Sequence, residues 1–309
     1  MNTAMEDTDI AAGLAARVSP ATVIRRDEPL AKRTTMRVGG PADVFVEPAS
    51  DEDLAAVVRF CGEQRREFFV LGRGSNLLVR DGGFRGAVIS LAHAHFSRVT
   101  VDGERLRCGA GAKLKEVAAA AKRASLGGLE FLEGIPGSVG GALRMNAGAM
   151  GGATFDFVES VRVMDGSGLI CELSRRAIEV EYRACPLFKT HIALGCVFHG
   201  KPAPRTEIEA KLNEFNRKRW DCQPAMPSAG CTFKNPSKEI PAGKLVEELG
   251  LKGARVGGAL VSAEHGNFIV NDGKATAGEV LKLIEIIRQH AKAERGIDLH
   301  TEVEIIGED

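Results

Sequence analysis

Apolar and polar residues along the chain follow two different periods, which succeed one another repeatedly. Asp43–Glu47 alternates polar and apolar residues, as a half-buried strand does. Ser50 then precedes three acidic residues, and apolar residues recur at i, i+3, i+4 and i+7 from Leu54, which predicts a capped amphipathic helix. Phe68–Leu71 and Ala87–Leu91 are short apolar runs with the length of buried strands.

The same alternation continues through the middle of the chain, except between Gly127 and Gly152, where glycine is frequent and a long loop is expected. Asp165-Gly166-Ser167-Gly168 is typical of a hairpin turn. The expected elements are strands at Arg98–Val101 and Arg105–Cys108, a helix with Leu114, Val117, Ala118 and Ala121 on one face, hairpin strands at Val158–Met164 and Leu169–Leu173, and a strand at Ile192–His199.

Two capping boxes predict the helices of the last third. Thr206-x-x-Glu209 precedes the stripe of Ile208, Leu212 and Phe215, and Thr276-x-x-Glu279 precedes Val280, Leu281, Ile284, Ile287 and Ala291. Phe268–Asn271 and Glu302–Ile306 are predicted strands. The sequence therefore predicts an α+β fold with an extension at 1–30, a first domain at 31–205 made of subdomains near 31–100 and 101–205, and a last domain at 206–309.

Composition narrows the class of protein. The chain has 309 residues, which favours two or three domains. Lys plus Arg and Asp plus Glu are both 41, so a nucleic-acid partner is not expected, although a local basic pocket for a small anion is compatible with this balance. The start of the chain has no signal-peptide pattern and no run of 18 apolar residues occurs, so we expect a cytoplasmic protein with no membrane contact.

The seven cysteines are scattered and include no CxxC pair, which argues against a disulfide framework and against a structural zinc site. We therefore expect no metal. Thirty-six glycines point instead to backbone that approaches a ligand closely.

Two glycine-rich stretches are candidates for that role. Gly72, Arg73, Gly74, Ser75 and Asn76 follow a predicted strand and could form a nest of backbone N–H groups for phosphate, although an ordinary turn is an equally good interpretation. It is not a dinucleotide fingerprint, since Leu77 stands where a third glycine belongs.

The second stretch, GIPGSVGGALRMNAGAMGG at 134–152, is more specific, because a long segment so poor in bulk rarely serves packing alone. Its candidate ligand-binding residues are Gly134, Ile135, Gly137, Ser138, Gly140, Arg144 and Asn146. No GxxxxGK[ST] occurs, so a Walker phosphate loop is excluded.

Cys231 in AGCTFKNP leaves three interpretations open. A small buried apolar residue is the commonest fate of a free cysteine. Metal binding is disfavoured because no partner stands at ligand spacing, and the third interpretation is proton transfer or nucleophilic attack. Nothing in the sequence supports His265 as a partner base. By themselves, Tyr182-Arg183 and Glu302 are weak signals, since most such residues lie at the surface.

Taken together and in order, several stretches resemble the UDP-N-acetylenolpyruvoylglucosamine reductase family over residues 30 to 307. They are TTMRVGGPAD (34–43), GRGSNLLV (72–79), GIPGSVGGALRMNAGA (134–149), YR (182–183), PSAGCTFKNP (227–236), HGNFIVN (265–271) and HTEVEIIG (300–307). The resemblance implies a two-subdomain FAD-binding region of the vanillyl-alcohol-oxidase type, followed by an α+β substrate domain. It places the pyrophosphate of non-covalent FAD on the two glycine stretches.

The resemblance also implies the reaction and its residues. NADPH reduces the flavin, and flavin N5 then passes hydride to the enolpyruvyl group of a UDP-sugar. Arg183 and Glu302 match the groups that stabilise the enolate, with Glu302 protonated, and Cys231 matches the proton donor. The substrate-binding residues would be Arg144, Asn146, Tyr182, Arg219, Lys234 and Asn235. A monomer without an obligate protein partner is expected.

Two departures from the family pattern matter. The family usually has serine where this chain has Cys231. The only tyrosine is Tyr182, so the chain resembles the shorter branch, which lacks the substrate-covering tyrosine loop. The alternatives are an FAD-dependent oxidase of the same fold acting on another substrate and a flavin-binding protein without catalysis.

Overall fold

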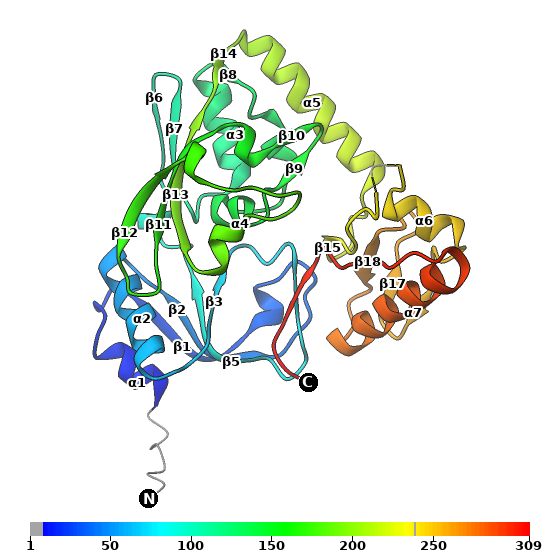
Figure 1. Ribbon diagram of the computed structural model, residues 1–309, viewed down its shortest axis with the longest axis horizontal. Coiled ribbons are helices and arrows are strands. Elements are labelled where there is room, and N and C mark those ends of the chain that lie inside the picture. The colour runs from blue at the N-terminus through cyan, green and yellow to red at the C-terminus, as the bar shows by residue number, and fades with distance from the viewer. Residues whose placement is uncertain (1–8, 238) are drawn as a thin grey trace, which may run out of the picture. The chain divides into compact units, whose positions relative to one another are not determined.

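The computed structural model describes residues 9–237 and 239–309, which divide into two compact units (Figure 1). Of the described residues, the first unit contains 9–28, 42–72 and 85–212, and the second contains 29–41, 73–84 and 213–309. The second unit thus takes two short segments from the N-terminal third, which a linear division near residue 205 does not include. Among the described residues, no helix is both long enough and apolar enough to cross a bilayer.

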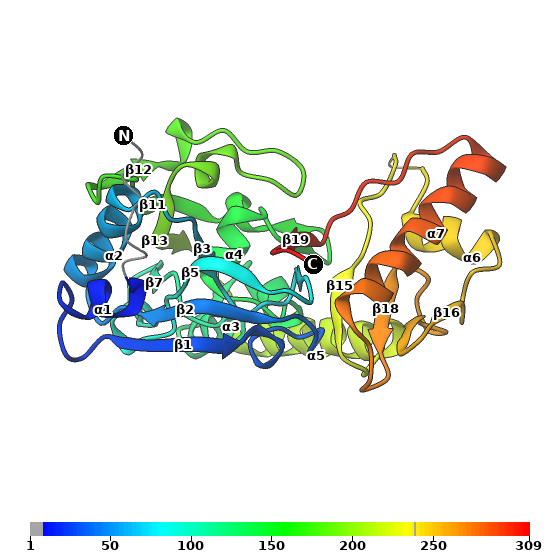
Figure 2. The ribbon, with the colours of Figure 1, turned by 90° about the horizontal axis from the view of Figure 1, so that it is seen from below.

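The N-terminal part of the first unit is a four-stranded sheet in the order β1-β2-β5-β3, with α1 packed against α2 (Figure 2). Its elements are α1 (Ile10–Ala15), β1 (Val23–Pro29), β2 (Pro41–Glu47), α2 (Asp51–Glu63), β3 (Phe68–Leu71) and β5 (Phe84–Ser90). The strands predicted at 43–47, 68–71 and 87–91 are confirmed, with shifts of a few residues at their ends. The N-terminal extension contributes α1 and β1, so its described part belongs to the fold.

The helix predicted from Ser50 onward is confirmed, because the Ser50 side chain accepts from Asp53 N and caps α2. The Asp53 carboxylate is buried and accepts from Ser19 N at 2.7 Å, Ser19 Oγ at 2.7 Å and Thr22 Oγ1 at 2.9 Å. Burial alone would raise the pKa of Asp53, but these hydrogen bonds outweigh it and the pKa lies below its usual value. The carboxylate therefore ties the extension to α2.

Asp53→Asn is expected to lower the free energy of unfolding at pH 7 by roughly 1–3 kcal/mol, because an amide cannot accept three hydrogen bonds there. Since the folded pKa is depressed, this stabilisation is present above the unfolded pKa of about 3.9 and is lost as the pH falls through the folded value. Urea unfolding between pH 7 and pH 2 measures it. The exposed neighbour Glu52→Gln is the control, and an equal effect of both variants would contradict the assignment.

The rest of the first unit is built on a five-stranded antiparallel sheet in the order β12-β11-β13-β7-β6, against which α3 and α4 pack (Figure 1). Its elements are β6 (Val99–Asp102), β7 (Arg105–Gly109), α3 (Leu114–Arg123), β11 (Val158–Met164), β12 (Ile170–Ser174) and β13 (Ile192–His199). The predicted strands, hairpin and helix of this region are confirmed. The hairpin turn is held by Asp165 Oδ1, which accepts from Ser167 N and Leu169 N.

The expectation of an unbroken loop between Gly127 and Gly152 was wrong. The segment contains β8 (Leu126–Gly127), α4 (Val139–Arg144), β9 (Gly148–Ala149) and β10 (Gly152–Ala153), and β8 pairs with β14 (Lys201–Pro202). Glycines lower helix propensity, so the pattern concealed α4. Packing supplies its stability: Val139 and Leu143 are buried, and a Cβ on Gly140 would lie 3.1 Å from Ala110 Cβ.

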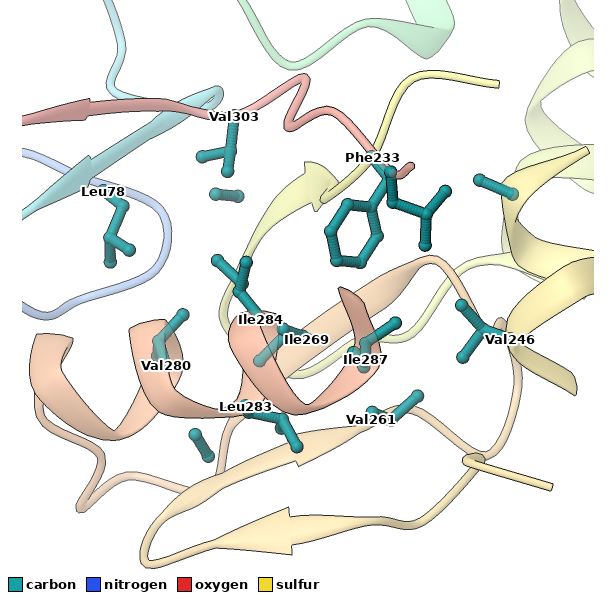
Figure 3. Close-up of a cluster of buried hydrophobic side chains, with 14 of the residues drawn as sticks. Leu78, Phe233, Val246, Val261, Ile269, Val280, Leu283, Ile284, Ile287 and Val303 are labelled. Atoms are coloured by element: carbon teal, nitrogen blue, oxygen red, sulfur yellow. The ribbon is translucent and has the colours of Figure 1, made fainter. Parts of the chain in front are cut away.

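The second unit packs α6 (Ala242–Glu248) and α7 (Ala277–Arg295) with a sheet in the order β15-β18-β17-β16. The strands are β15 (Ser228–Cys231), β16 (Arg255–Val256), β17 (Ala259–Val261) and β18 (Phe268–Asn271), and β4 (Leu77–Val79) pairs in parallel with β19 (Glu304–Ile306). Phe233, Ile269, Ile284 and Ile287 point into its core (Figure 3).

α5 (Arg205–Cys222) runs from the first unit into the second, and it begins one residue before Thr206. The first predicted capping box is therefore wrong. The carbonyl of Pro204 accepts hydrogen bonds from Glu207 N and Ile208 N, and the Glu209 carboxylate forms an ion pair with Arg205. The second box is confirmed, because Thr276 and Glu279 cap α7 reciprocally.

The last strand begins at Glu304, so Glu302 precedes it. Short 3-10 turns lie at Leu30–Lys32, Ala94–Phe96, Glu130–Gly134, Thr154–Asp156, Arg175–Ala177 and Pro186–Lys189.

Candidate active site

Within the first unit, the two glycine stretches come together. A Cβ built on Gly72, at the end of β3, would lie 2.8 Å from Ser138 Oγ. The backbone at Ser138 runs beside 110–114, since Val139 N donates to Ala112 O at 2.9 Å and Gly140 N to Ala110 O at 2.8 Å. Ser138 is buried. The first predicted phosphate stretch therefore begins against the second.

The segment before Ser138 leaves bare backbone beside open space. A Cβ built on Gly134 would meet no atom within 4 Å, and Ile135 N and Gly137 N bond to the local carbonyls of Leu132 and Ile135. Open space beside Gly134, with a hydroxyl at Ser138, lets a flat ligand approach the backbone closely. These residues of the first unit fit FAD.

The remaining residues of the first stretch, Arg73 to Asn76, group with the second unit. There Gly74 has φ +60°, and a Cβ on it would meet Arg33 O at 2.4 Å. The close approach of the 33–34 backbone therefore explains this glycine without a ligand.

Gly72→Ala is expected to weaken FAD binding by about tenfold or more, because an added methyl group in a tight contact costs about 1–3 kcal/mol. The measurement is the dissociation constant of FAD for the reconstituted apoprotein. Gly62→Ala is the control, since a Cβ on Gly62 meets nothing within 4 Å. Unchanged FAD affinity in Gly72→Ala would remove this residue from the cofactor site.

Arg183 occupies a tight turn of the first unit. Glu181 N donates to Ala184 O at 2.9 Å, and Ala184 N donates back at 3.3 Å. Arg183 has φ +57°, in the left-handed region that non-glycine residues seldom adopt. Its guanidinium carbon lies 5.2 Å from the centre of the Tyr182 ring, which is 59% exposed. A strained conformation held by surrounding structure is typical of functional positions.

Arg144 and Asn146 hold the segment that carries this turn. Asn146 Nδ2 donates to Glu181 O at 3.3 Å, and its Oδ1 accepts from Phe155 N at 3.2 Å. Arg144 Nη1 donates to Phe188 O at 2.9 Å. Through Arg144 and Asn146, the glycine-rich stretch thus also positions the turn of Tyr182 and Arg183. The sequence had suggested only substrate binding for Arg144 and Asn146.

In the second unit, Cys231 and Glu302 lie on adjacent backbone segments. Cys231 ends β15 opposite Phe268, after an irregularity at which Gly230 takes φ +77°. Glu302 N donates to Thr232 O at 2.8 Å, so the residue after Cys231 is bonded to Glu302. Both side chains are half-buried. Two of the three predicted catalytic residues therefore lie on backbone segments that are distant in sequence and hydrogen-bonded to each other.

Asn76 also contacts this region. Its Nδ2 donates to Glu302 O at 3.0 Å, and its own carbonyl accepts from Glu304 N at 3.0 Å. The sequence analysis assigned Asn76 to the cofactor, but the structure shows its amide on the backbone of Glu302. Long-range pairing of this kind leaves no sequence signal beyond an asparagine that directly precedes a strand.

The remaining predicted binding residues of the second unit are Lys234, Asn235 and Arg219. Lys234 N donates to His300 O at 2.9 Å, which keeps Lys234 on the segment that follows Cys231. Asn235 Oδ1 accepts from Ala242 N at 3.0 Å and so caps α6. Arg219 lies in the last turn of α5.

Several other cysteines and His265 are buried, and burial shifts their pKa values. No cysteine forms a disulfide, and burial raises the pKa of Cys61 to about 11 and that of Cys108 to about 12. Burial lowers the pKa of His265, whose Nδ1 accepts from Asn267 N at 3.1 Å. Within the described residues, no group of three or more His, Cys, Asp or Glu side chains could hold a metal ion.

Two family models match this chain. Residues 42–174 match the FAD binding domain, and residues 223–306 match the C-terminal domain of UDP-N-acetylenolpyruvoylglucosamine reductase. The chain is 42% identical over 285 residues to that reductase from Clostridium botulinum, covering 92% of each, and 42% identical over 278 residues to the one from Clostridium novyi, covering 89% of this chain and 90% of the relative.

A solved structure supports the same grouping. The reductase from Thermus caldophilus matches with a TM-score of 0.79 and 37% identity, over 93% of this chain and 99% of that one. The two matched domains define an FAD-dependent oxidoreductase whose flavin-binding region is followed by an α+β C-terminal domain. The chain belongs to the UDP-N-acetylenolpyruvoylglucosamine reductase family.

Proposed function

We propose that the protein reduces UDP-N-acetylglucosamine enolpyruvate to UDP-N-acetylmuramate with NADPH as reductant, in cytoplasmic peptidoglycan precursor synthesis. Membership of the reductase family supports the substrate class. The observation that carries the proposal is the hydrogen bond of 2.8 Å from Glu302 N to Thr232 O, because it pairs the backbone at Glu302 with the backbone that directly follows Cys231. A double-bond reduction needs both a group that stabilises negative charge and a proton donor.

The chemistry that bound FAD supplies is hydride transfer, first from NADPH and then to the terminal carbon of the enolpyruvyl double bond. Negative charge then develops on the substrate carboxylate. The planar guanidinium of Arg183 suits a carboxylate, and backbone hydrogen bonds hold the turn that carries it. Glu302, when protonated, donates a hydrogen bond to the same group.

Cys231 completes the addition by giving its thiol proton to the carbon next to the carboxylate. A thiol with an ordinary pKa of about 8.5 releases a proton far more readily than an alcohol does. The net change is one hydride and one proton added across the double bond, with NADPH oxidised to NADP⁺.

Binding roles follow the two units. In the first unit, Gly72, Gly134, Ile135, Gly137, Ser138 and Gly140 hold FAD, and Arg144, Asn146 and Tyr182 serve the substrate directly or through the Arg183 turn. In the second unit, Arg73 and Ser75 remain candidates for FAD, whereas Gly74 is required by the nearby 33–34 backbone and the Asn76 amide supports Glu302. Arg219, Lys234 and Asn235 bind the acidic groups of the substrate. A monomer that needs no protein partner is sufficient for this chemistry.

Product analysis in deuterated water tests the reaction. With NADPH and the enolpyruvyl substrate, mass spectrometry should show two solvent deuteriums per product. One lies on the carbon next to the carboxylate, and one lies on the terminal carbon because the N5 hydrogen of a reduced flavin exchanges with water. The control replaces the substrate by oxygen and simple alcohols. Oxygen consumption there, with no reduced UDP-sugar, would favour the oxidase alternative and overturn the proposal.

A further inference from the structure

One buried side chain outside the predicted set clamps the segment that follows Cys231. Asn267 is 3% exposed. Its Oδ1 accepts from Phe233 N at 2.9 Å, and its Nδ2 donates to Phe233 O at 2.8 Å. Its own carbonyl accepts from Thr232 N at 2.7 Å. Three hydrogen bonds from one residue therefore fix the two residues after Cys231.

The same two residues, Thr232 and Phe233, pair with the segment that carries Glu302. Thr232 O accepts from Glu302 N at 2.8 Å, and Phe233 pairs with Thr301. The Phe233 ring is buried in the core of the second unit, beside Ile284 and Ile287 (Figure 3). A shift of the Thr232–Phe233 backbone would move Cys231 and Glu302 together.

The chemistry of this clamp requires an amide. Phe233 offers one N–H and one C=O, and only a side chain with both an acceptor and a donor satisfies the two at once. Aspartate keeps the acceptor but cannot donate when ionised, and alanine leaves both backbone groups buried without that partner. A fully satisfied polar group of this kind rigidifies its surroundings.

We propose that Asn267 is a positioning residue for the reaction, which sets Cys231 and Glu302 for the protonation step by clamping Thr232–Phe233. The proposal rests on the proposed function of those two residues. Asn267 does not touch the reacting atoms, so its loss should slow the substrate half-reaction and leave flavin reduction by NADPH unchanged.

The chain offers a matched control at the other end of β18. Asn271 is also 3% exposed, and its side chain donates to Met36 O at 3.0 Å and accepts from Gly273 N at 2.7 Å and Ala275 N at 3.0 Å. Asn271→Ala therefore removes an equally buried amide with comparable bonds, none of them to the 231–233 segment. Thermal unfolding of both variants is measured first and should show comparable losses of stability.

The test is rapid mixing of each half-reaction with the flavin-loaded protein. In Asn267→Ala, reoxidation by the enolpyruvyl substrate should slow by about 10²-fold, the cost of a misplacement near 1 Å, while Asn271→Ala keeps the wild-type rate. Labelling of Cys231 by iodoacetamide, read by mass spectrometry, should quicken only in Asn267→Ala. If Asn267→Ala does not fold, Asn267→Asp is measured in its place and should show the same selective loss.

A wild-type rate of reoxidation and labelling in the Asn267 variant would overturn the inference, and so would equal slowing in both asparagine variants. If the wild-type protein itself is not reoxidised by the substrate, the proposed function fails instead. The labelling contrast then still decides whether Asn267 positions Cys231.

Discussion

Cys231→Ala is expected to slow reoxidation of the reduced flavin by the enolpyruvyl substrate by about 10²–10⁴-fold, the range for loss of a general acid. Reduction by NADPH should proceed at the wild-type rate, because no proton from Cys231 is needed there. Cys231→Ser should keep substantial activity, since a hydroxyl can occupy the same place at the end of β15 and donate a proton. Rapid-mixing spectroscopy of the flavin bands separates the two steps.

The control for loss of a thiol is Cys171→Ser, because Cys171 is exposed on β12 and has no proposed role in the reaction. It should match the wild-type protein in both half-reactions. Near-normal reoxidation in Cys231→Ala would remove Cys231 as the proton donor, and some other group or a water molecule would have to supply the proton.

Arg183→Ala is expected to slow the substrate half-reaction by about 10²–10³-fold, the usual effect of removing one group that stabilises developing negative charge. Arg183→Lys should recover only part of this loss, because an ammonium group keeps the charge without the planar fork. The exposed Arg176→Ala serves as the control for loss of a positive charge nearby in sequence.

The φ of +57° at Arg183 adds a second readout. Glycine adopts this conformation without the steric cost of about 1–2 kcal/mol that a Cβ imposes. Arg183→Gly should therefore unfold at a higher temperature than Arg183→Ala, although both lose the substrate half-reaction. Equal melting temperatures would show that the turn is not strained, and an active Arg183→Gly would show that the guanidinium has no role in charge stabilisation.

Periodicity predicted the elements that bury one regular face. α2 and α3 were found from their apolar stripes, and β13 and β18 were found as continuous apolar runs that are buried on both faces. α4 was missed because Gly140 and Gly141 hide a helix whose stability comes from packing. The cap of α7 was only half predictable: the Thr276–Glu279 box is local, but Ala277 N and Gly278 N also donate to Asp81, which lies far away in the sequence.

The candidate site divides in the same way. Cys231 and Glu302 could be named from family motifs, whereas their adjacency depends on the pairing of Thr232 with the segment before β19. Asn267 was missed because a polar residue at the start of the apolar run Phe268–Asn271 looks like an ordinary strand boundary. Its amide bonds to the backbone of Phe233, which lies 34 residues earlier in the sequence. Side-chain-to-backbone bonds of this kind have no period to detect.

The most direct test of the account is an anaerobic titration of the flavin in the purified protein. Addition of NADPH should bleach the visible flavin bands, and subsequent addition of UDP-N-acetylglucosamine enolpyruvate should restore the oxidised bands promptly. Bleaching without recovery would contradict the assignment of the substrate, while leaving the protein a flavin-dependent oxidoreductase that reduces something else.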